Sequence, residues 1–438
     1  MTDKLDILKN KISSNDYVSH VDLSNCGLKH FPFTELLPLQ HSLVYLNLGG
    51  NYIEYLHEEE IIVFQKLKIL FFGSNLFRKY PRCLCKLPDL YMVSFKSNEL
   101  VEIEEDCFSN PRLTWLILTD NKLTKIPSSI GNLIYLRKLM LSGNMIEELP
   151  TELDCCKELE LVRIAANRLA CIPPWFYSLP KLSWIAFAGN LLPQRPSPTD
   201  AIQSIEFDDV LIDYSSKLGE GTSGVVYKCT WNSLEYAIKL FKTSTTTSDG
   251  LPEDEMKACI AAGKHPNLVS VVGYTINHPN NTPALLFDVI PSDYSIFGQP
   301  PSLDTCTRDV YAVDKQVSIV TGFAILNGIS SALGHLHSRG INHGDVYGHN
   351  IMVSNSTSDC LLCDFGSATF YDNSINKEIE KNEVRAFGCL VDDILSVLSD
   401  GDSNSTSASK LGKLRDMCLS GIDLRPTFQE IVQYLREC

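Results

Sequence analysis

The feature that most constrains this chain is a pattern that recurs through its first half. Residues 20–196 repeat L-x-x-L-x-L-x-x-N-x-L, with other apolar residues at some leucine positions. Cys26 takes the asparagine place in the first copy, and from the third copy onward the step is 23 residues. The asparagines are Asn51, Asn75, Asn98, Asn121, Asn144, Asn167 and Asn190. One copy cannot bury its own apolar face, so about eight copies are expected to stack into a curved solenoid.

Copies such as "LTWLILTDNKLTKIP" (113–127) and "LRKLMLSGNMIEELP" (136–150) resemble the leucine-rich repeat family. The resemblance covers about 175 residues and implies a parallel β horseshoe. In each copy the two leucines of L-x-L would point inward from a short strand. The asparagine would satisfy backbone groups at the turn that follows, where no strand partner is available. We expect residues 1–19 to form an N-terminal cap segment.

Two strand positions of each copy are expected to face the concave side of the solenoid. They are unusually apolar, and exposed apolar or aromatic patches often bind partners. The sequence therefore predicts a protein partner, or the chain's own second half, on this face. The alternative is that these side chains only pack on neighbours within the sheet. The positions are Tyr45, Ile69, Met92, Trp115, Lys138, Leu161 and Trp184, and Asn47, Phe71, Ser94, Ile117, Met140, Arg163 and Ala186.

A domain boundary is expected after the last repeat. "LLPQRPSPTD" (191–200) has three prolines in ten residues, which suits a surface connection. A length of 438 residues also favours two domains. We predict repeats over 20–196, a linker over 197–209 and a second domain over 210–438.

Charge and composition exclude several classes of function. The net charge of −15 argues against nucleic acid or an anionic membrane surface as a partner. No signal peptide or apolar run of about 18 residues is evident, so we expect no membrane span and a cytoplasmic location. The 15 cysteines read as reduced thiols. Cys360 and Cys363 have metal-ligand spacing but lack a second pair, so we interpret them, like Cys83 and Cys85, as buried thiols.

The second half opens with a glycine-rich segment, "KLGEGTSGVVYKCTWNSLEYAIKLF" (217–241). A dinucleotide-binding unit would place a helix after the glycines, but "VVYKCTW" is β-branched and aromatic, which favours a hairpin. Glycines in such a turn let the backbone approach ATP phosphates, and Lys239 falls where a third strand would present it to the α- and β-phosphates. The candidate nucleotide-binding residues here are Gly219, Gly221, Gly224, Val226, Ala237 and Lys239.

Residues 210–438 resemble the eukaryotic-type protein kinase domain, whose motifs follow in order. "LPEDEMKACIAAGKHPNLVSVVGY" (251–274) resembles the regulatory helix, with Glu255 the ion-pair partner of Lys239 and Glu253 and Asp254 as alternatives. "PALLFDVI" (283–290) resembles the fifth strand and hinge. The resemblance implies that Phe287 is the gatekeeper and that Asp288 begins the adenine contact.

The catalytic loop is carried by "INHGDVYGHNIMV" (341–353), and Asp364-Phe365-Gly366 follows. The resemblance implies that Asp345 orients the acceptor hydroxyl and takes its proton, that Asn350 and Asp364 hold Mg²⁺, and that Lys239 fixes the phosphates of ATP. His343 is interpreted as structural.

Two later motifs extend the resemblance. Glu383 stands where the next helix normally has an aspartate, and Arg425 lies in the closing Arg-Pro signature of "GIDLRPTFQEIVQYL".

Three departures bear on control and substrate. Gly344 replaces the usual arginine before the catalytic aspartate, Tyr347 replaces a common lysine, and no Ala-Pro-Glu follows the short activation segment. His349 is a candidate substitute for that lysine. Without an arginine at 344 to receive a phosphate, we expect activity that does not need phosphorylation of the segment.

We therefore predict a multidomain protein, with a leucine-rich repeat solenoid followed by an α+β two-lobed kinase fold. Its predicted activity is ATP- and Mg²⁺-dependent transfer of phosphate to serine or threonine of a protein substrate. The repeats would bind a protein partner or the kinase lobe. The alternatives are a binding scaffold that takes nucleotide without catalysis, and a kinase for a small molecule.

Overall fold

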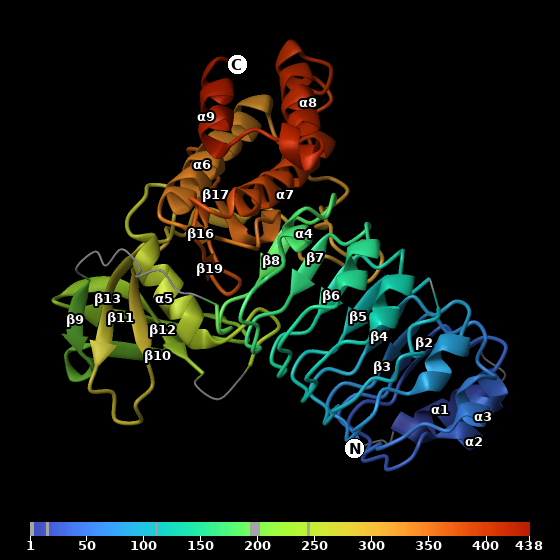
Figure 1. The fold of residues 1–438 in the computed structure, drawn as a ribbon. Helices are drawn as coiled ribbons and strands as arrows, with labels where there is room; N and C mark the ends of the chain where they lie inside the picture. Colours follow the sequence, from blue (N-terminus) through green and yellow to red (C-terminus); the bar gives the residue numbers. More distant parts are fainter. Residues whose placement is uncertain (1–3, 15–16, 111, 193–201, 243–245) are drawn as a thin grey trace. The chain divides into compact units, whose positions relative to one another are not determined.

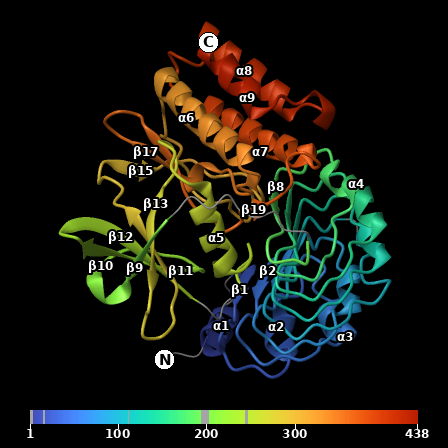
Figure 2. The ribbon, with the colours of Figure 1, turned by 60° about the vertical axis from the view of Figure 1, so that its left-hand side comes forward.

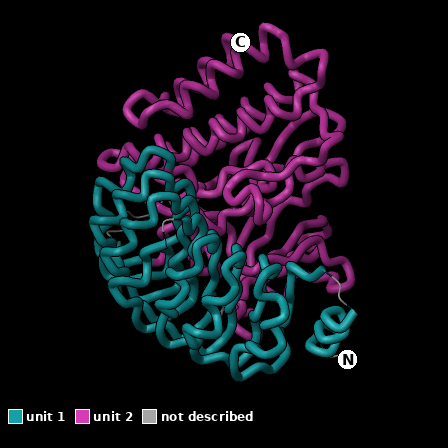
Figure 3. The backbone as a smooth tube through the Cα atoms, turned by 90° about the vertical axis from the view of Figure 1, so that its right-hand side faces the viewer, with its two compact units in different colours: residues 1–181, 190–192 teal, residues 182–189, 193–438 magenta. Residues whose placement is uncertain are grey.

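The computed structural model describes residues 4–14, 17–110, 112–192, 202–242 and 246–438. The chain divides into two compact units (Figure 3). The first comprises residues 1–181 and 190–192, and the second comprises residues 182–189 and 193–438. Each unit is described by itself.

The first unit is a solenoid with one three-residue strand per repeat (Figure 1). Its strands pair in parallel and in chain order. The central residue of each strand is fully or nearly buried, as Leu46, Leu70 and Leu116 show. The predicted repeat solenoid is confirmed. The strands are β1 (His20–Asp22), β2 (Tyr45–Asn47), β3 (Ile69–Phe71), β4 (Met92–Ser94), β5 (Trp115–Ile117), β6 (Lys138–Met140) and β7 (Leu161–Arg163).

Short helices, most of them single turns, return the chain between these strands. These turns vary between α-helical and 3₁₀ because the connecting sequences differ from repeat to repeat, whereas the strands share one residue pattern. The α-helical turns are α2 (Phe33–Leu36), α3 (Glu58–Ile61) and α4 (Pro174–Tyr177), and the 3₁₀ turns are η1 (Leu37–Leu39), η2 (Arg82–Lys86), η3 (Ser128–Asn132) and η4 (Thr151–Cys155).

The repeat asparagines satisfy the backbone at each turn, as expected. Asn98 is buried, and its amide nitrogen donates to Phe72 O at 2.9 Å and Phe95 O at 3.1 Å. Its Oδ1 accepts from Phe77 N at 3.1 Å. An asparagine therefore links its own repeat to the preceding one. The same arrangement recurs at Asn51, Asn75, Asn121, Asn144 and Asn167.

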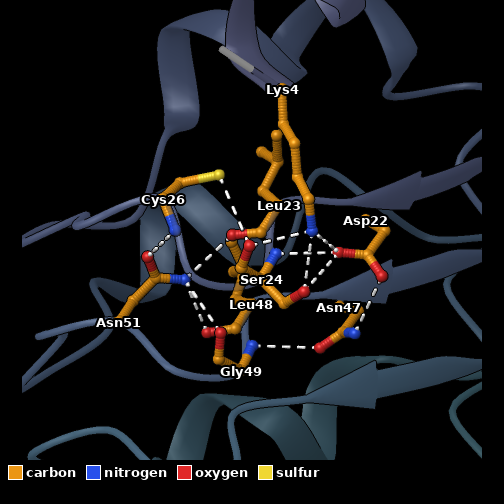
Figure 4. A network of polar contacts seen from close by, with 9 residues as sticks. All are labelled: Lys4, Asp22, Leu23, Ser24, Cys26, Asn47, Leu48, Gly49 and Asn51. Atoms are coloured by element: carbon orange, nitrogen blue, oxygen red, sulfur yellow. Dashed lines mark hydrogen bonds and ion pairs between the residues drawn. The ribbon is translucent and has the colours of Figure 1, made fainter. Parts of the chain in front are cut away.

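The solenoid begins with a helix, α1 (Lys4–Ser13), tied to the first repeat by a charged contact (Figure 4). Lys4 Nζ lies 2.8 Å from Asp22 Oδ1 and 2.9 Å from Ser24 O. Burial opposes ionisation of Asp22, but hydrogen bonds from Lys4 and Ser24 hold the pKa of this carboxyl well below its usual range. In the first turn, Cys26 N donates to Asn51 Oδ1 at 3.0 Å, and the Cys26 thiol, in the place of the repeat asparagine, donates to Ser24 O at 3.6 Å.

Most members of the predicted apolar stripe are buried in the structure. Neighbouring strands supply some of the contacts: the rings of Tyr45 and Phe71 lie 5.6 Å apart, and Lys138 Nζ lies 4.1 Å from the centre of the Trp115 ring. Packing within the sheet therefore explains part of the stripe. The buried members are Ile69, Met92, Trp115, Leu161, Trp184, Ser94, Arg163 and Ala186, and the partly exposed ones are Tyr45, Asn47, Phe71, Ile117, Lys138 and Met140.

The second unit starts with a six-stranded sheet, ordered β10-β11-β12-β14-β13-β9. The glycine segment joins two antiparallel strands, as predicted, because β-branched residues follow the turn. Helix α5 (Pro252–Ala262) follows the third strand of this meander. The strands are β9 (Gln203–Glu206), β10 (Leu211–Glu220), β11 (Gly224–Trp231), β12 (Leu234–Phe241), β13 (Val271–Ile276) and β14 (Ala284–Asp288).

The predicted linker 197–209 differs from the structure in its second part. Residues 197–201 lie outside the described residues, but β9 pairs in parallel with β13 and is followed by a 3₁₀ turn, η5 (Phe207–Asp209). Ile205 is 2% exposed and joins the core cluster of this sheet with Ile238 and Leu286. Burial of one isoleucine and a free sheet edge thus outweigh the polar composition of the segment.

The remainder of the second unit is mainly helical (Figure 2). Ser318 caps α6 by accepting from Thr321 N at 3.1 Å, and Thr427 with Glu430 forms a capping box at α9. The helices are α6 (Ile319–Ser338), α7 (Lys377–Ser396), α8 (Thr406–Leu419) and α9 (Phe428–Arg436); short strands are β15 (Tyr294–Ile296), β16 (Ile341–Asn342), β17 (Ile351–Ser354), β18 (Cys360–Leu362) and β19 (Thr369–Phe370).

Helix α6 corrects the expectation that the chain holds no long apolar run. By length and composition alone it could cross a membrane, a test that core helices of soluble proteins also pass. In the structure it packs with α9 and β18, and Ile325, Leu326 and Ile329 are fully buried. The helix is therefore a core element of the second unit.

Candidate active site

A cavity of about 640 Å³ in the second unit gathers the predicted nucleotide-binding residues. This volume is within the usual range for small-molecule sites. The glycine turn, β12, α5, the chain after β14 and the segment after β18 all contribute to its wall. Among the predicted residues, the lining includes Gly219, Gly221, Gly224, Val226, Ala237, Lys239, Glu255, Phe287, Asp288 and Asp364.

Lys239 and Glu255 form a buried ion pair at the back of this cavity. Lys239 Nζ contacts Glu255 Oε1, and their side chains are 18% and 3% exposed. Burial alone would lower the pKa of Lys239, but the Glu255 carboxylate outweighs burial and raises it. The lysine is therefore held as a cation in the cavity. Glu253 is exposed, and Asp254 bonds Lys257, so the structure separates Glu255 from both alternatives.

Asp345 and Asn350 are joined across the catalytic loop. The amide nitrogen of Asn350 donates to Asp345 O and to Asp345 Oδ2, both at 2.9 Å. His343 supports the same loop, because its Nδ1 accepts from Asp345 N at 3.3 Å and its Nε2 lies 3.1 Å from Cys363 O. These bonds assign the ring proton to Nε2. The predicted structural role of His343 agrees with its full burial.

Asp364 carries a backbone conformation that is unusual outside glycine. Its φ is +62°, and its Oδ1 accepts from Gly366 N at 3.0 Å. Non-glycine residues held at positive φ often occur at functional sites, where the surroundings fix the side-chain direction. Asp364 lines the same cavity as Lys239.

Among the three glycines of the turn, only Gly224 is required by packing. A Cβ on Gly224 would meet Leu240 O at 2.5 Å, whereas a Cβ on Gly219 or Gly221 would meet nothing within 4 Å. The open space beside Gly219 and Gly221 lets a ligand approach their backbone. Gly221 N donates to Gly224 O at 2.9 Å and closes the turn.

Glu383 anchors the catalytic loop from α7. Its Oε1 accepts from Gly344 N at 2.6 Å, and its Oε2 accepts from His343 N at 3.2 Å. His337 Nε2 lies 2.8 Å from Oε2, and Tyr371 OH lies 2.6 Å from His337 Nδ1. Burial opposes ionisation of Glu383, but these hydrogen bonds, led by His337, lower its pKa. The glutamate therefore fills the aspartate position with a buried carboxylate that binds two backbone N–H groups of the loop.

Sequence reasoning missed a strap over residues 297–311 that holds the other end of the loop. Asp309 accepts from His349 N at 2.9 Å and lies 2.7 Å from His349 Nδ1. A Cβ on Gly348 would meet the Tyr311 hydroxyl at 2.3 Å. The signal that could have found the strap is Gly348 itself, since a glycine inside a catalytic loop often marks a close approach by another segment.

The Cys360 and Cys363 pair carries no metal signature. Burial raises the pKa of both thiols to about 12, which keeps them protonated at neutral pH. Across the described ranges of the chain, no cluster of three or more His, Cys, Asp or Glu side chains suited to a metal is found. Cys360 opens the buried strand β18.

Family comparisons agree with this geometry. Residues 212–386 match the protein kinase domain, and residues 88–146 and 111–169 match the leucine rich repeat. The fold and the site therefore define a protein kinase domain that follows a leucine-rich repeat region.

Two relatives and one solved structure are similar to parts of the chain. A protein of Acanthamoeba polyphaga mimivirus, named provisionally as a serine/threonine-protein kinase, is 27% identical over 161 residues, covering 36% of this chain and 27% of the relative. The Dictyostelium discoideum protein gdt4, named as a probable serine/threonine-protein kinase, is 31% identical over 167 residues, covering 37% of this chain and 9% of the relative. A leucine-rich repeat protein structure from Leptospira interrogans aligns with a TM-score of 0.39 and 26% identity, covering 43% of this chain and 46% of that one. The chain thus spans about a quarter or less of the two relatives' own length.

Proposed function

We propose that the protein transfers phosphate from ATP to serine or threonine residues of a protein substrate. The observation that carries the proposal is the convergence of an intact catalytic set in one unit. Lys239 is ion-paired with Glu255, Asp345 is bonded to Asn350, and Asp364 lines the same cavity as Lys239. Catalysis of phosphoryl transfer consists mainly of positioning and charge stabilisation, which these groups can provide.

Each residue then has a distinct task. Lys239, kept cationic by Glu255, would contact the phosphates of ATP. The Asp345 carboxylate would accept a hydrogen bond from the acceptor hydroxyl and take its proton. The bond from Asn350 to Asp345 Oδ2 fixes the direction of that carboxylate. Hinge residues Phe287 and Asp288 would bound the adenine side of the cavity.

The donor set fits Mg²⁺, a hard cation that prefers oxygen ligands. Both bonds of Asn350 to Asp345 use the amide nitrogen, so the amide oxygen is the atom suited to a cation. Asp364 would supply carboxylate oxygen. Bound Mg²⁺ would neutralise charge on the phosphates during transfer.

The test is incubation of the full-length protein with γ-labelled ATP and Mg²⁺, with a panel of protein substrates and analysis of the labelled amino acid. Label on serine or threonine is expected, and Asp364→Asn should remove it. Asp364→Asn is nearly isosteric, so its melting temperature without nucleotide serves as the folding control.

The two alternatives give different results in the same experiment. A scaffold without catalysis would show a higher melting temperature with ATP and Mg²⁺, because a ligand that binds only the folded state stabilises it, but no transfer. A small-molecule kinase would transfer label only to compounds of low mass. Either result would replace the proposed activity.

For the repeats we propose binding of a protein partner through the partly exposed members of the concave face. Phe71, Ile117 and Met140 are the large apolar side chains among them. Phe71→Ser should weaken a captured complex by about 2 kcal/mol or more if the ring is an anchor. The control is Ile134→Ser, an exposed apolar residue outside the strands. If Phe71→Ser and Ile134→Ser capture the partner equally well, the apolar side chains of the concave face serve only internal packing.

A further inference from the structure

Residues 182–189 belong to the second unit, where they contact the catalytic loop. Their strand is β8 (Trp184–Ala186). Trp184 Nε1 donates to Val346 O at 3.0 Å, and the Trp184 ring stacks on Tyr347 with centroids 4.5 Å apart and planes at 6°. Tyr347 in turn lies 4.9 Å from the His349 ring, which Asp309 holds. The residue that replaces the family's lysine is therefore one member of an aromatic stack.

The same strand explains the glycine before the catalytic aspartate. Gly344 has φ +75°, and a Cβ there would meet Ile185 O at 2.4 Å and Ser367 O at 2.8 Å. Ile185 O also accepts from Asn342 Nδ2 at 3.3 Å. An arginine at position 344 would need both a strained backbone and the space that the β8 backbone fills.

Further contacts extend from β8 to two other elements of the site. Phe187 N donates to Thr369 Oγ1 at 3.3 Å in the activation segment. Arg385 Nη1 donates to Ser183 Oγ at 2.8 Å from α7, the helix that carries Glu383. One short segment thus bonds the catalytic loop, the activation segment and the helix behind them.

We propose that residues 182–189 are a positioning segment of the active site, with Trp184 as the positioning residue for the catalytic loop. In many kinases an arginine before the catalytic aspartate orders the activation segment by pairing with a phosphate. Here the backbone of residues 185–187 takes the place of that arginine. Ile185 O lies against Gly344 and accepts from Asn342, and Phe187 N donates to Thr369 of the activation segment. None of these contacts involves a charged group. This inference rests on the proposed kinase function for its kinetic consequence only.

The test compares full-length Trp184→Ala and Trp184→Phe with the wild type by hydrogen exchange and kinetics. Trp184→Ala should speed amide exchange in residues 343–349 at least tenfold and lower kcat about tenfold, equivalent to about 1.4 kcal/mol. KM for ATP should stay within twofold, because the nucleotide cavity is lined by other elements. Trp184→Phe keeps an aromatic ring but loses the Nε1 hydrogen bond, so its exchange rate and its kcat should lie between those of the wild type and of Trp184→Ala. Trp175→Ala removes an indole from the first unit and should change neither measurement.

Coupling separates positioning from general packing. Tyr347→Ala should reproduce the loss of kcat, and the double variant with Trp184→Ala should be no slower than the single variants. Exchange and kcat within twofold of wild type in Trp184→Phe and Tyr347→Ala would overturn the proposal, even if Trp184→Ala did not fold. If the wild type transfers no phosphate, the proposed function fails, while the exchange measurement still decides the role of Trp184.

Discussion

Glu383→Gln should strongly destabilise the second unit, because the side chain is 1% exposed and surrounded by donors. The carboxylate receives the backbone N–H groups of His343 and Gly344 on different oxygens, and His337 lies beside one of them. Glutamine keeps the length but turns one of these acceptors into an NH₂ donor, which leaves a buried N–H facing another donor. Hydrogen bonds to a charged group contribute about 1.5–3 kcal/mol each, so the expected loss is roughly 3–5 kcal/mol.

Calorimetry of the full-length protein can measure this loss. Two compact units need not unfold together, so the relevant transition is that of the second unit, which added ATP and Mg²⁺ should raise under the proposed function. For a domain of this size a loss of 1 kcal/mol lowers the melting temperature by about 2–4 °C, so a drop of roughly 6–20 °C is expected. Glu378→Gln is the matched control, since Glu378 is exposed on the same helix and should cost less than about 1 kcal/mol.

The pH dependence gives a second check. The pKa of Glu383 is lowered in the folded protein from its ordinary value of 4.5. Its stabilisation is therefore fully present above about pH 4.5 and is lost as the pH falls through the folded pKa. The stability difference between wild type and Glu383→Gln should be constant from pH 7 to 5 and shrink below that range. A melting temperature equal to that of Glu378→Gln, or a difference that grows in acid, would refute the reasoning.

Three further outcomes are expected. Lys239→Met and Asp345→Asn should each reduce phosphate transfer roughly 100-fold or more. Lys239→Met should also lower the melting temperature, because it leaves the buried Glu255 carboxylate without its partner; transfer equal to wild type in both variants would exclude the enzyme. Gly344→Ala should lower the free energy of unfolding by about 2–5 kcal/mol, because of its left-handed φ and two backbone clashes. The control Gly412→Ala lies inside α8 with open space around it and should raise the free energy of unfolding by about 0.5–1 kcal/mol. Calorimetric shifts of the same sign in the two variants would contradict this reasoning. Ser374→Ala should leave the rate within about threefold, or 0.65 kcal/mol, and a 100-fold loss rescued by Ser374→Glu would show control by phosphate.

The solenoid could be predicted from sequence because each repeat uses the same letters for the same contacts. The leucine of each strand is buried and the asparagine bonds two neighbouring turns, so periodicity alone reports the geometry. The exposure of the concave positions could not be predicted in this way. Exposure depends on contacts with residues outside the repeat pattern: Trp184, which belongs to the second unit, contacts Val346 and Tyr347, more than 150 residues later in the chain.

The main residues of the site could also be predicted, but their supports could not. Glu255 was separable from its two acidic neighbours only once the start of α5 at Pro252 fixed the helix phase. Asp309 lies 40 residues before His349, and no local spacing connects the two. In both cases the residue is identified by a contact with a residue far away in the sequence, and a local sequence motif carries no information about such a contact.

The hydroxyl residues of the activation segment indicate how the contacts that hold the catalytic loop would affect regulation by phosphorylation. Four hydroxyl residues lie between Asp364 and α7. Ser367 is buried, Thr369 is buried and accepts from Phe187 N, and Tyr371 is buried against His337. Ser374 is exposed, with its hydroxyl bonded to Asp372. Phosphate on Thr369 or Tyr371 would have to break bonds around the catalytic loop, and phosphate on Ser367 would have to be accommodated in a buried position, so each would disorder the site. Because Glu383 and the β8 backbone already fix the catalytic loop, we expect modification of this segment to lower the proposed activity far more readily than to raise it.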